Sequence, residues 1–265
     1  MVKMSSDNTI LVLIIIFTIM YWLLKPICTK LTTYKFDSGR PGPHILLVGT
    51  SHGNEPAASV GFQKLADMLS SGDLSLAKGK LTIIPCLNPC GKKIHIRWLP
   101  HQLFLLHSID LNRNYAKSLD DEGSCTISRK IERLSHDVDL IIDGHEGYDF
   151  VKTNPKSMGS AVYAGKHPLS QSLVPNMVSD LNKTITSKPK GVNKKRLDKM
   201  KVEDFQFISH TETDLPGTLR WYSDNHDIPY VLIETTGQND IQPLDVRSNQ
   251  HLILALSALR QLGML

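Results

Sequence analysis

The chain has 265 residues, of which 41% are hydrophobic and 21% are charged, and its formal net charge is +4. These values are typical of a folded globular protein and exclude a disordered or low-complexity chain. The small positive charge suits an anionic substrate or a membrane surface, but it is too small to indicate a nucleic-acid-binding protein.

An uncharged apolar segment, Thr9 to Leu24, lies near the N-terminus, with Tyr21 and Trp22 at its far end. It is slightly shorter than the roughly 20 residues that span a bilayer comfortably. Interfacial aromatic residues can make up such a difference. Because no small-residue cleavage site follows, the pattern favours an uncleaved membrane anchor over a signal peptide.

Lysines near this segment predict its orientation. Lys25, Lys30 and Lys35 follow the apolar run, whereas Lys3 precedes it. Positive charge is enriched on the cytoplasmic side of membrane proteins, so the pattern predicts a single-pass membrane protein whose main domain faces the cytoplasm.

The remainder of the chain alternates between strand and helix patterns, which predicts an α/β domain with a mostly parallel sheet covered by helices on both faces. The predicted strands are 44–49, 80–87, 138–143 and 230–233, and the predicted helices are 56–69, 127–135 and 249–262. We therefore divide the chain into a membrane anchor with its linker, residues 1–36, and one α/β domain, residues 37–265, which is within the usual size of a single core.

Four polar residues fall at the carboxyl ends of predicted strands, where ligands bind in such sheets. They are His52, Glu55, His145 and Glu234. Alone, a histidine and a glutamate three residues apart are explained as well by a surface histidine and a helix-capping glutamate. With His145, they complete the two-histidine, one-glutamate set that holds a catalytic zinc and leaves one position for water.

Two further motifs suit the same chemistry. In DLNRN, Arg113 and the neighbouring Asn112 could bind a carboxylate through paired hydrogen bonds, although a helix-capping turn with a surface arginine explains the motif too. In IETTG, Glu234 ends an apolar strand, where a carboxylate is costly to bury without a task. Beside a zinc-bound water it would act first as general base and then as general acid.

The ordered set HGNE, NPCG, DLNRN, a histidine at a strand end, and ETTG resembles the zinc carboxypeptidase superfamily, which includes the succinylglutamate desuccinylase and aspartoacylase branch. The resemblance covers about His44 to Leu265. It implies a carboxypeptidase-like three-layer α/β fold around a mixed, mostly parallel sheet of eight strands.

The resemblance also implies the roles of individual residues. One Zn²⁺ per chain would be bound by His52, Glu55 and His145. Asp110 would orient the first of these histidines, a task that such supporting carboxylates perform at many metal sites. Glu234 would be the catalytic base.

Three further residues are matched to substrate handling. Asn112 and Arg113 correspond to the pair that binds the free carboxylate of the substrate, and Arg97 resembles the arginine that stabilises the tetrahedral oxyanion. The mobile tyrosine of the family has no assigned match here, with Tyr163 and Tyr222 as candidates.

Two departures from the family pattern concern the substrate more than the chemistry. The interval between Glu55 and His145 is short, as in the deacylase branch. Glu146 directly follows the ligand histidine, where many relatives carry a small polar residue, and either support of the ligands or contact with a substrate amine would suit it.

The sequence therefore predicts a membrane-anchored zinc hydrolase that cleaves an amide bond next to a free carboxylate. The favoured interpretation is a metallocarboxypeptidase acting on a peptide, and the alternative is a deacylase acting on an N-acyl amino acid. A third interpretation is an inactive, membrane-anchored binding protein that retains the fold. No nucleic-acid partner is expected, and no pattern indicates an oligomeric state.

Overall fold

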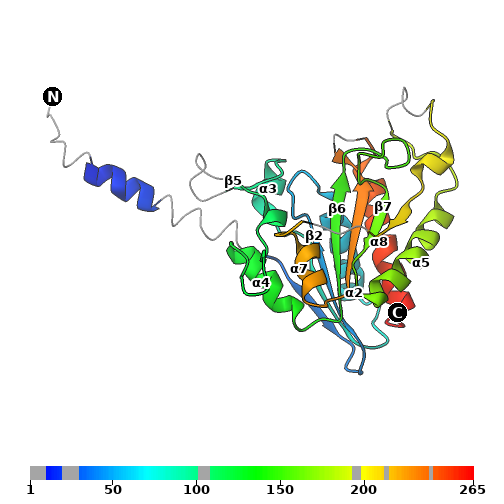
Figure 1. Ribbon diagram of the computed structural model, residues 1–265, viewed down its shortest axis with the longest axis horizontal. Helices are drawn as coiled ribbons and strands as arrows, with labels where there is room; N and C mark the ends of the chain where they lie inside the picture. Colours follow the sequence, from blue (N-terminus) through cyan, green and yellow to red (C-terminus); the bar gives the residue numbers. More distant parts are fainter. Residues whose placement is uncertain (1–9, 20–29, 101–107, 193–197, 212–214, 239–240) are drawn as a thin grey trace.

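The protein is described by a computed structural model that covers residues 10–19, 30–100, 108–192, 198–211, 215–238 and 241–265. Within this part of the chain, a central sheet lies between two layers of helices (Figure 1). Its strands are β1 (Tyr34–Asp37), β2 (His44–Gly49), β3 (Lys80–Ile84), β6 (Leu140–Gly147), β7 (Ala161–Ala164), β8 (Ile208–His210) and β9 (Tyr230–Thr236).

The strand order across the sheet is β1-β3-β2-β6-β9-β7-β8. Strands β3, β2, β6 and β9 form a parallel block, which β1 and β7 flank in antiparallel orientation, and β8 runs parallel to β7. The predicted mixed, mostly parallel sheet is thus confirmed, with seven strands in the described residues rather than the eight that the resemblance implied. A separate two-stranded ribbon joins β4 (Leu99–Pro100) to β5 (Ser108–Ile109).

Helices cover both faces of the sheet. One face is packed against α2 (Ala57–Ser71), α5 (Pro168–Thr184) and α8 (Leu244–Gln261). The other is packed against α4 (Thr126–Ser135) and α7 (Leu219–Asn225). Shorter elements are α3 (Pro89–Lys93) and the 3₁₀ helices η1 (Leu111–Arg113) and η2 (Val202–Phe205).

Strand β2 shows why the apolar runs of this sequence form central strands. Successive side chains of a strand point to opposite faces. Ile45 and Leu47 accordingly pack with α2 and α8, whereas Leu46 and Val48 pack with α4 and α7. Because both faces are covered, all four positions are apolar and buried, as is usual in parallel sheets.

The two strands that carry polar site residues are longer than predicted. All eight residues of β6 are buried, and the strand continues through His145 to Gly147 rather than ending at residue 143. Strand β9 likewise continues past Glu234 to Thr236. His145 was expected just past the end of its strand and Glu234 at the end of its own, but the two strands stay paired along this stretch, with His145 opposite Glu234.

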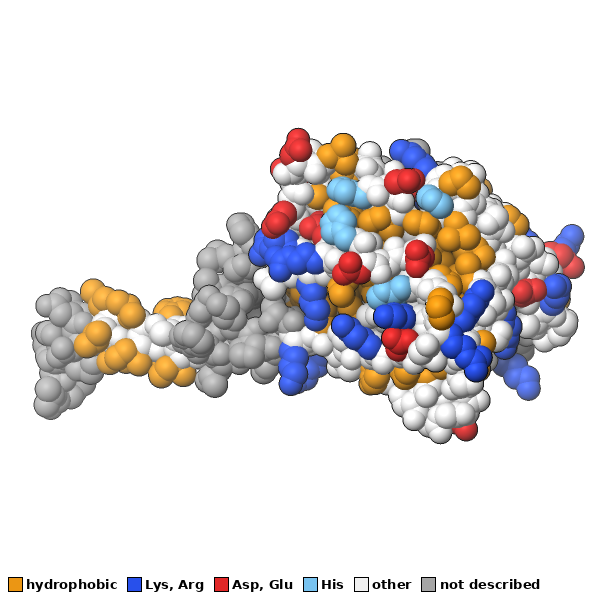
Figure 2. All heavy atoms as spheres, turned by 90° about the horizontal axis from the view of Figure 1, so that it is seen from below, with side chains coloured by type: hydrophobic (Ala, Val, Ile, Leu, Met, Phe, Trp, Pro, Cys, Tyr) orange, Lys and Arg blue, Asp and Glu red, His pale blue; other side chains and the backbone are white. Residues whose placement is uncertain are grey.

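The N-terminal prediction is wrong. Residues 10–19 form a helix whose apolar side chains are exposed (Figure 2). A helix of ten residues is about 15 Å long, about half the thickness of a bilayer core. In the described part of the chain, no helix has both the length and the apolar character needed to cross a membrane. The single-pass anchor, the membrane contact and the cytoplasmic orientation deduced from it are therefore not supported.

The remaining part of the predicted anchor, residues 20–24, lies outside the described residues. Strand β1, Tyr34–Asp37, pairs with β3 and so joins the sheet just before the domain boundary drawn at residue 37. The division into residues 1–36 and 37–265 stays a prediction.

Candidate metal centre

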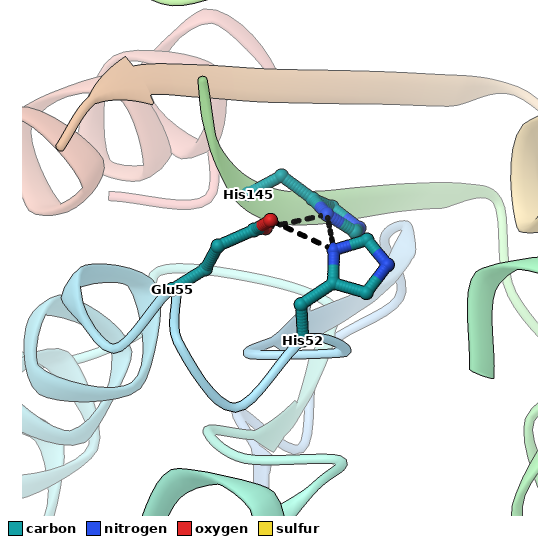
Figure 3. A group of neighbouring side chains, drawn as sticks. All are labelled: His52, Glu55 and His145. Carbon is teal, nitrogen blue, oxygen red and sulfur yellow. Dashed lines mark hydrogen bonds and ion pairs between the residues drawn. The ribbon is translucent and has the colours of Figure 1, made fainter. Parts of the chain in front are cut away.

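Three side chains that are distant in the sequence meet at the carboxyl end of the parallel block (Figure 3). His52 comes from the loop after β2, Glu55 lies just before α2, and His145 lies in β6. His52 Nδ1 is 2.9 Å from Glu55 Oε1, His145 Nδ1 is 3.0 Å from Glu55 Oε2, and the two Nδ1 atoms are 3.2 Å apart. All three residues are buried, so their polar atoms face one another rather than bulk water.

The loop between β2 and α2 has little freedom. A side-chain carbon at Gly53 would collide with the backbone of Gly91 and Lys92, so only glycine permits this close approach. Thr50 Oγ1 donates a hydrogen bond to the carbonyl oxygen of Glu55 at 3.0 Å. The loop therefore delivers His52 and Glu55 to the same point.

The outer nitrogen of each histidine ring faces a carboxylate. His52 Nε2 is 3.0 Å from Asp110 Oδ1, and His145 Nε2 is 3.2 Å from Asp143 Oδ2. These contacts favour the tautomer in which each Nε2 carries the proton, which leaves both Nδ1 lone pairs pointing at each other and at Glu55. A cation at this point would satisfy all three groups, and the carboxylate–histidine pairs are the usual supports of zinc ligands.

The electrostatics of the cluster also favour positive charge at this point. Burial lowers the pKa of His145, but the negative charges of Asp143 and Glu55 outweigh burial and raise it well above the ordinary value. Burial raises the pKa of Glu55, yet the charge of His52 and the close contacts with both histidines leave it well below the ordinary range. The residues present therefore fit a divalent metal ion.

Asp110 and Arg97 extend this network. Arg97 Nε donates to Asp110 Oδ2 at 3.0 Å, and its Nη1 reaches Glu55 Oε1 at 3.4 Å. Burial raises the pKa of Asp110, but His52 and Arg97 together hold it below the ordinary range. Asp110 thus contacts the histidine it was predicted to orient, and Arg97 lies beside the proposed metal ligands.

A cavity of about 240 Å³ opens over the cluster and also includes Asn112, Arg113 and Glu234 in its lining. Asn112 Oδ1 accepts a hydrogen bond from Leu219 N at 3.1 Å, so its carbonyl oxygen is held by α7. The exposed Arg113 donates from Nη1 to Asn112 O at 2.6 Å. Donor groups of two neighbouring residues therefore border the cavity, as binding of a carboxylate requires, but that role stays a prediction.

Glu234 is positioned by the pairing of β9 with β6, in which it lies opposite His145. Leu232 and Tyr230 pack on the same face of the sheet as α4 and α7, and strand alternation puts Glu234 on that face. Burial raises its pKa to about 8, with opposing effects from the positive charges of His145 and Arg97. A carboxyl group that titrates near neutral pH is suited to accept and return a proton.

The side chain of Glu146 is committed to the protein scaffold. Glu146 Oε1 accepts a hydrogen bond from Ala57 N at 2.7 Å, at the first residue of α2, and its Oε2 forms a buried ion pair with Arg247 of α8. Burial raises its pKa to about 7 despite the Arg247 charge. Its backbone N–H donates to Glu55 Oε2 at 3.2 Å, which supports the candidate ligand directly.

The two candidate tyrosines lie elsewhere. Tyr163 stacks on His210, and the hydroxyl of Tyr222 lies 3.1 Å from His136 Nε2; both tyrosines are buried and outside the cavity lining. Tyr148, three residues after His145 and 41% exposed, lines the cavity instead.

Sequence reasoning also missed Asp143 and Gln238. Asp143 could have been found, because a residue two positions before His145 in a strand points to the same face. Gln238 lies beyond the end of β9, and only its closeness to Glu234 in the sequence offered a hint.

Comparisons with known proteins agree with the predicted resemblance. Residues 41–156 match the model of the Succinylglutamate desuccinylase/Aspartoacylase catalytic domain, which indicates a hydrolase. The comparison with curated proteins gave no match.

Several solved structures share the fold. Csd4 from Helicobacter pylori, a D,L-carboxypeptidase in its mDAP-bound form, matches 84% of this chain with a TM-score of 0.62 and 18% identity. The ectoine utilization protein EutE (DoeB) from Ruegeria pomeroyi matches 88% of this chain with a TM-score of 0.59 and 18% identity. A succinylglutamate desuccinylase from Silicibacter sp. TM1040 matches 89% of this chain with a TM-score of 0.59 and 17% identity. The chain spans 52%, 61% and 61% of these proteins, respectively.

Proposed function

From the premise that this chain has the zinc carboxypeptidase fold and matches the succinylglutamate desuccinylase/aspartoacylase catalytic domain, we propose that it is a zinc-dependent hydrolase of amide bonds next to a free carboxylate. The observation that carries the proposal is the meeting of His52, Glu55 and His145 at one buried point, with both histidines supported by carboxylates.

In this proposal, His52 Nδ1, Glu55 and His145 Nδ1 would hold the ion. When bound, zinc supplies Lewis acidity toward a carbonyl oxygen and makes water a stronger acid. Glu234 takes the proton of the attacking water and returns it to the leaving nitrogen. The guanidinium of Arg97 donates to the developing oxyanion, a type of stabilisation that is commonly worth several kcal/mol.

Asn112 and Arg113 bind the free carboxylate of the substrate and so determine which amide bond is hydrolysed. A carboxylate bound by the Asn112 amide and the Arg113 guanidinium holds the adjacent amide over the cluster, since all these groups line one cavity. The contact contributes to substrate binding in the ground state and in the transition state alike.

Two substrate classes fit this arrangement. Metallocarboxypeptidase activity on a peptide is the first, supported by the fold shared with Csd4. Deacylation of an N-acyl amino acid is the second, supported by the domain match over residues 41–156. Both need the same metal, the same base and a free carboxylate beside the scissile bond.

The test combines metal analysis with a substrate panel. The purified protein would be assayed for bound zinc and then offered peptides with a free C-terminal carboxylate alongside N-acyl amino acids. We expect about one zinc per chain and hydrolysis of one class. Absence of both zinc binding and hydrolysis would contradict the proposal and favour an inactive binding protein.

A further inference from the structure

Gln238 is a side chain of the cavity to which the mechanism above gives no task. It follows β9 by two residues and lines the cavity together with Glu55 and Glu234. Its Nε2 donates to Glu55 Oε1 at 2.9 Å and to the backbone oxygen of Glu146 at 2.6 Å.

These two contacts fix the orientation of the Gln238 amide. A side-chain amide has two N–H donors at one end and a carbonyl acceptor at the other. A carboxylate oxygen and a backbone oxygen can only accept, so the nitrogen must face Glu55 and Glu146. The carbonyl oxygen is left as the free polar atom, since both hydrogen bonds of this amide to described residues are made by its nitrogen.

The backbone that carries Gln238 is held at the preceding residue. Gly237 N donates to Gly147 O at 3.0 Å, and Arg247 Nη1 donates to Gly237 O at 2.9 Å. A side-chain carbon at Gly237 would collide with the Glu146 carboxylate and with Arg247. The Glu146–Arg247 pair therefore fixes the turn from which Gln238 enters the cavity.

The cavity lining also presents cationic donors to a substrate. Arg97, Arg113 and Lys156 line it, and their guanidinium and ammonium groups donate hydrogen bonds but cannot accept them. They suit the carboxylate and carbonyl oxygens of an amide substrate. The remaining polar group of a secondary amide is its N–H, which needs an acceptor, and the carbonyl oxygen of Gln238 can accept from it.

We propose that Gln238 is a substrate-binding residue whose Oε1 accepts a hydrogen bond from the N–H of the scissile amide, and that it thereby makes the site selective for secondary amides over esters. The inference rests on the proposed function. It follows from the placement of the residue, since the amide that touches Glu55 also lies beside any group bound over the cluster.

The energetic consequence is a penalty for substrates without the N–H. A site built to pair a polar group rejects an analogue that leaves its own partner unpaired. For a neutral hydrogen bond in a partly open cavity we expect about a tenfold contribution to selectivity.

The test uses a matched pair of substrates that differ only in the scissile group, one amide and one ester, with the same acyl group and the same free carboxylate. The ratio of kcat/KM for amide to ester is measured in the native protein, in Gln238→Met, which has similar length but no acceptor, and in Gln238→Ala. Comparing ratios cancels any change in metal content, because both substrates use the same centre. Met158→Leu, which alters another residue of the cavity lining, is the control.

We expect the amide-to-ester ratio to fall about tenfold in both Gln238 variants and to stay unchanged in Met158→Leu. In a Glu234→Gln background, where turnover is too slow to interfere, the same two compounds can be compared by binding. There, each Gln238 substitution should weaken binding of the amide relative to that of the ester. A ratio that stays constant in both Gln238 variants, in turnover and in binding, would overturn this inference alone. If the native protein hydrolysed neither amides nor esters, the proposed function itself would fall.

Discussion

The two sides of the cavity are held in different ways. On the metal side, His52 and His145 are buried, and each is supported by its own carboxylate. On the arginine side, Arg113 is exposed and donates a hydrogen bond to the neighbouring backbone oxygen of Asn112. Rigid support suits groups that must hold one geometry through a reaction, whereas an exposed arginine suits recognition of substrates that arrive from solvent.

This difference predicts that changes on the metal side affect turnover and metal affinity, whereas changes on the arginine side affect substrate binding. The largest effect is expected from Glu234→Gln, which keeps the shape of the side chain but removes its ability to accept a proton. The turnover number should fall by about a thousandfold, while bound zinc stays near the native level. Glu203→Gln, an exposed change on η2, is the control. Near-native turnover in Glu234→Gln would remove Glu234 from the role of base.

The next largest effect is a loss of stability when the buried ion pair of Arg247 with Glu146 is broken. Arg247→Met would leave Glu146 without its charged partner in the interior, and we expect a loss of about 3 kcal/mol in the free energy of unfolding. The exposed pair of Lys183 with Asp180 is the matched comparison, and Lys183→Met should change stability by less than about 1 kcal/mol. Equal stability losses in chemical denaturation of the two variants would contradict the distinction.

Asp143→Ala removes the carboxylate that faces His145 Nε2 and accepts a hydrogen bond from the Tyr230 hydroxyl at 2.9 Å. Loss of this support should weaken zinc binding by about 10- to 100-fold, as measured by competition with a chelator of known affinity. Asp67→Ala, an exposed change on α2, should leave zinc affinity unaltered. Unaltered affinity in Asp143→Ala as well would show that the carboxylate does not support the ligand.

The smallest effect should come from the arginine side. Arg113→Met should raise KM by about tenfold with little change in kcat, because a charge-assisted hydrogen bond to the substrate carboxylate is lost at an exposed position. A substrate whose carboxylate is converted to an amide should be handled alike by the native and variant proteins. A fall in kcat with unchanged KM would place Arg113 in the chemistry instead.

The same contrast explains what the sequence could predict. His52, Glu55, His145 and Glu234 follow apolar strand patterns, and parallel strands bring their carboxyl ends to one edge of a sheet. Their convergence was therefore predictable from local patterns.

Residues that depend on turns and on tertiary contact were not predictable in this way. Gln238 reaches Glu55 from a turn in which Arg247 of a distant helix binds the carbonyl oxygen of Gly237. Tyr148 lines the cavity from the segment after β6, whereas the tyrosines chosen from the sequence are buried elsewhere. The N-terminal anchor was predicted from an apolar run and its flanking aromatic and lysine residues, and the helix described there covers residues 10–19.

The central claim is that His52, Glu55 and His145 bind one metal ion. The most direct test is a calorimetric titration of the metal-free protein with zinc, in which the native protein is compared with His145→Ala. The account predicts one tight site in the native protein and its loss in a folded His145→Ala variant. Equally tight binding of one zinc ion in both proteins would contradict it.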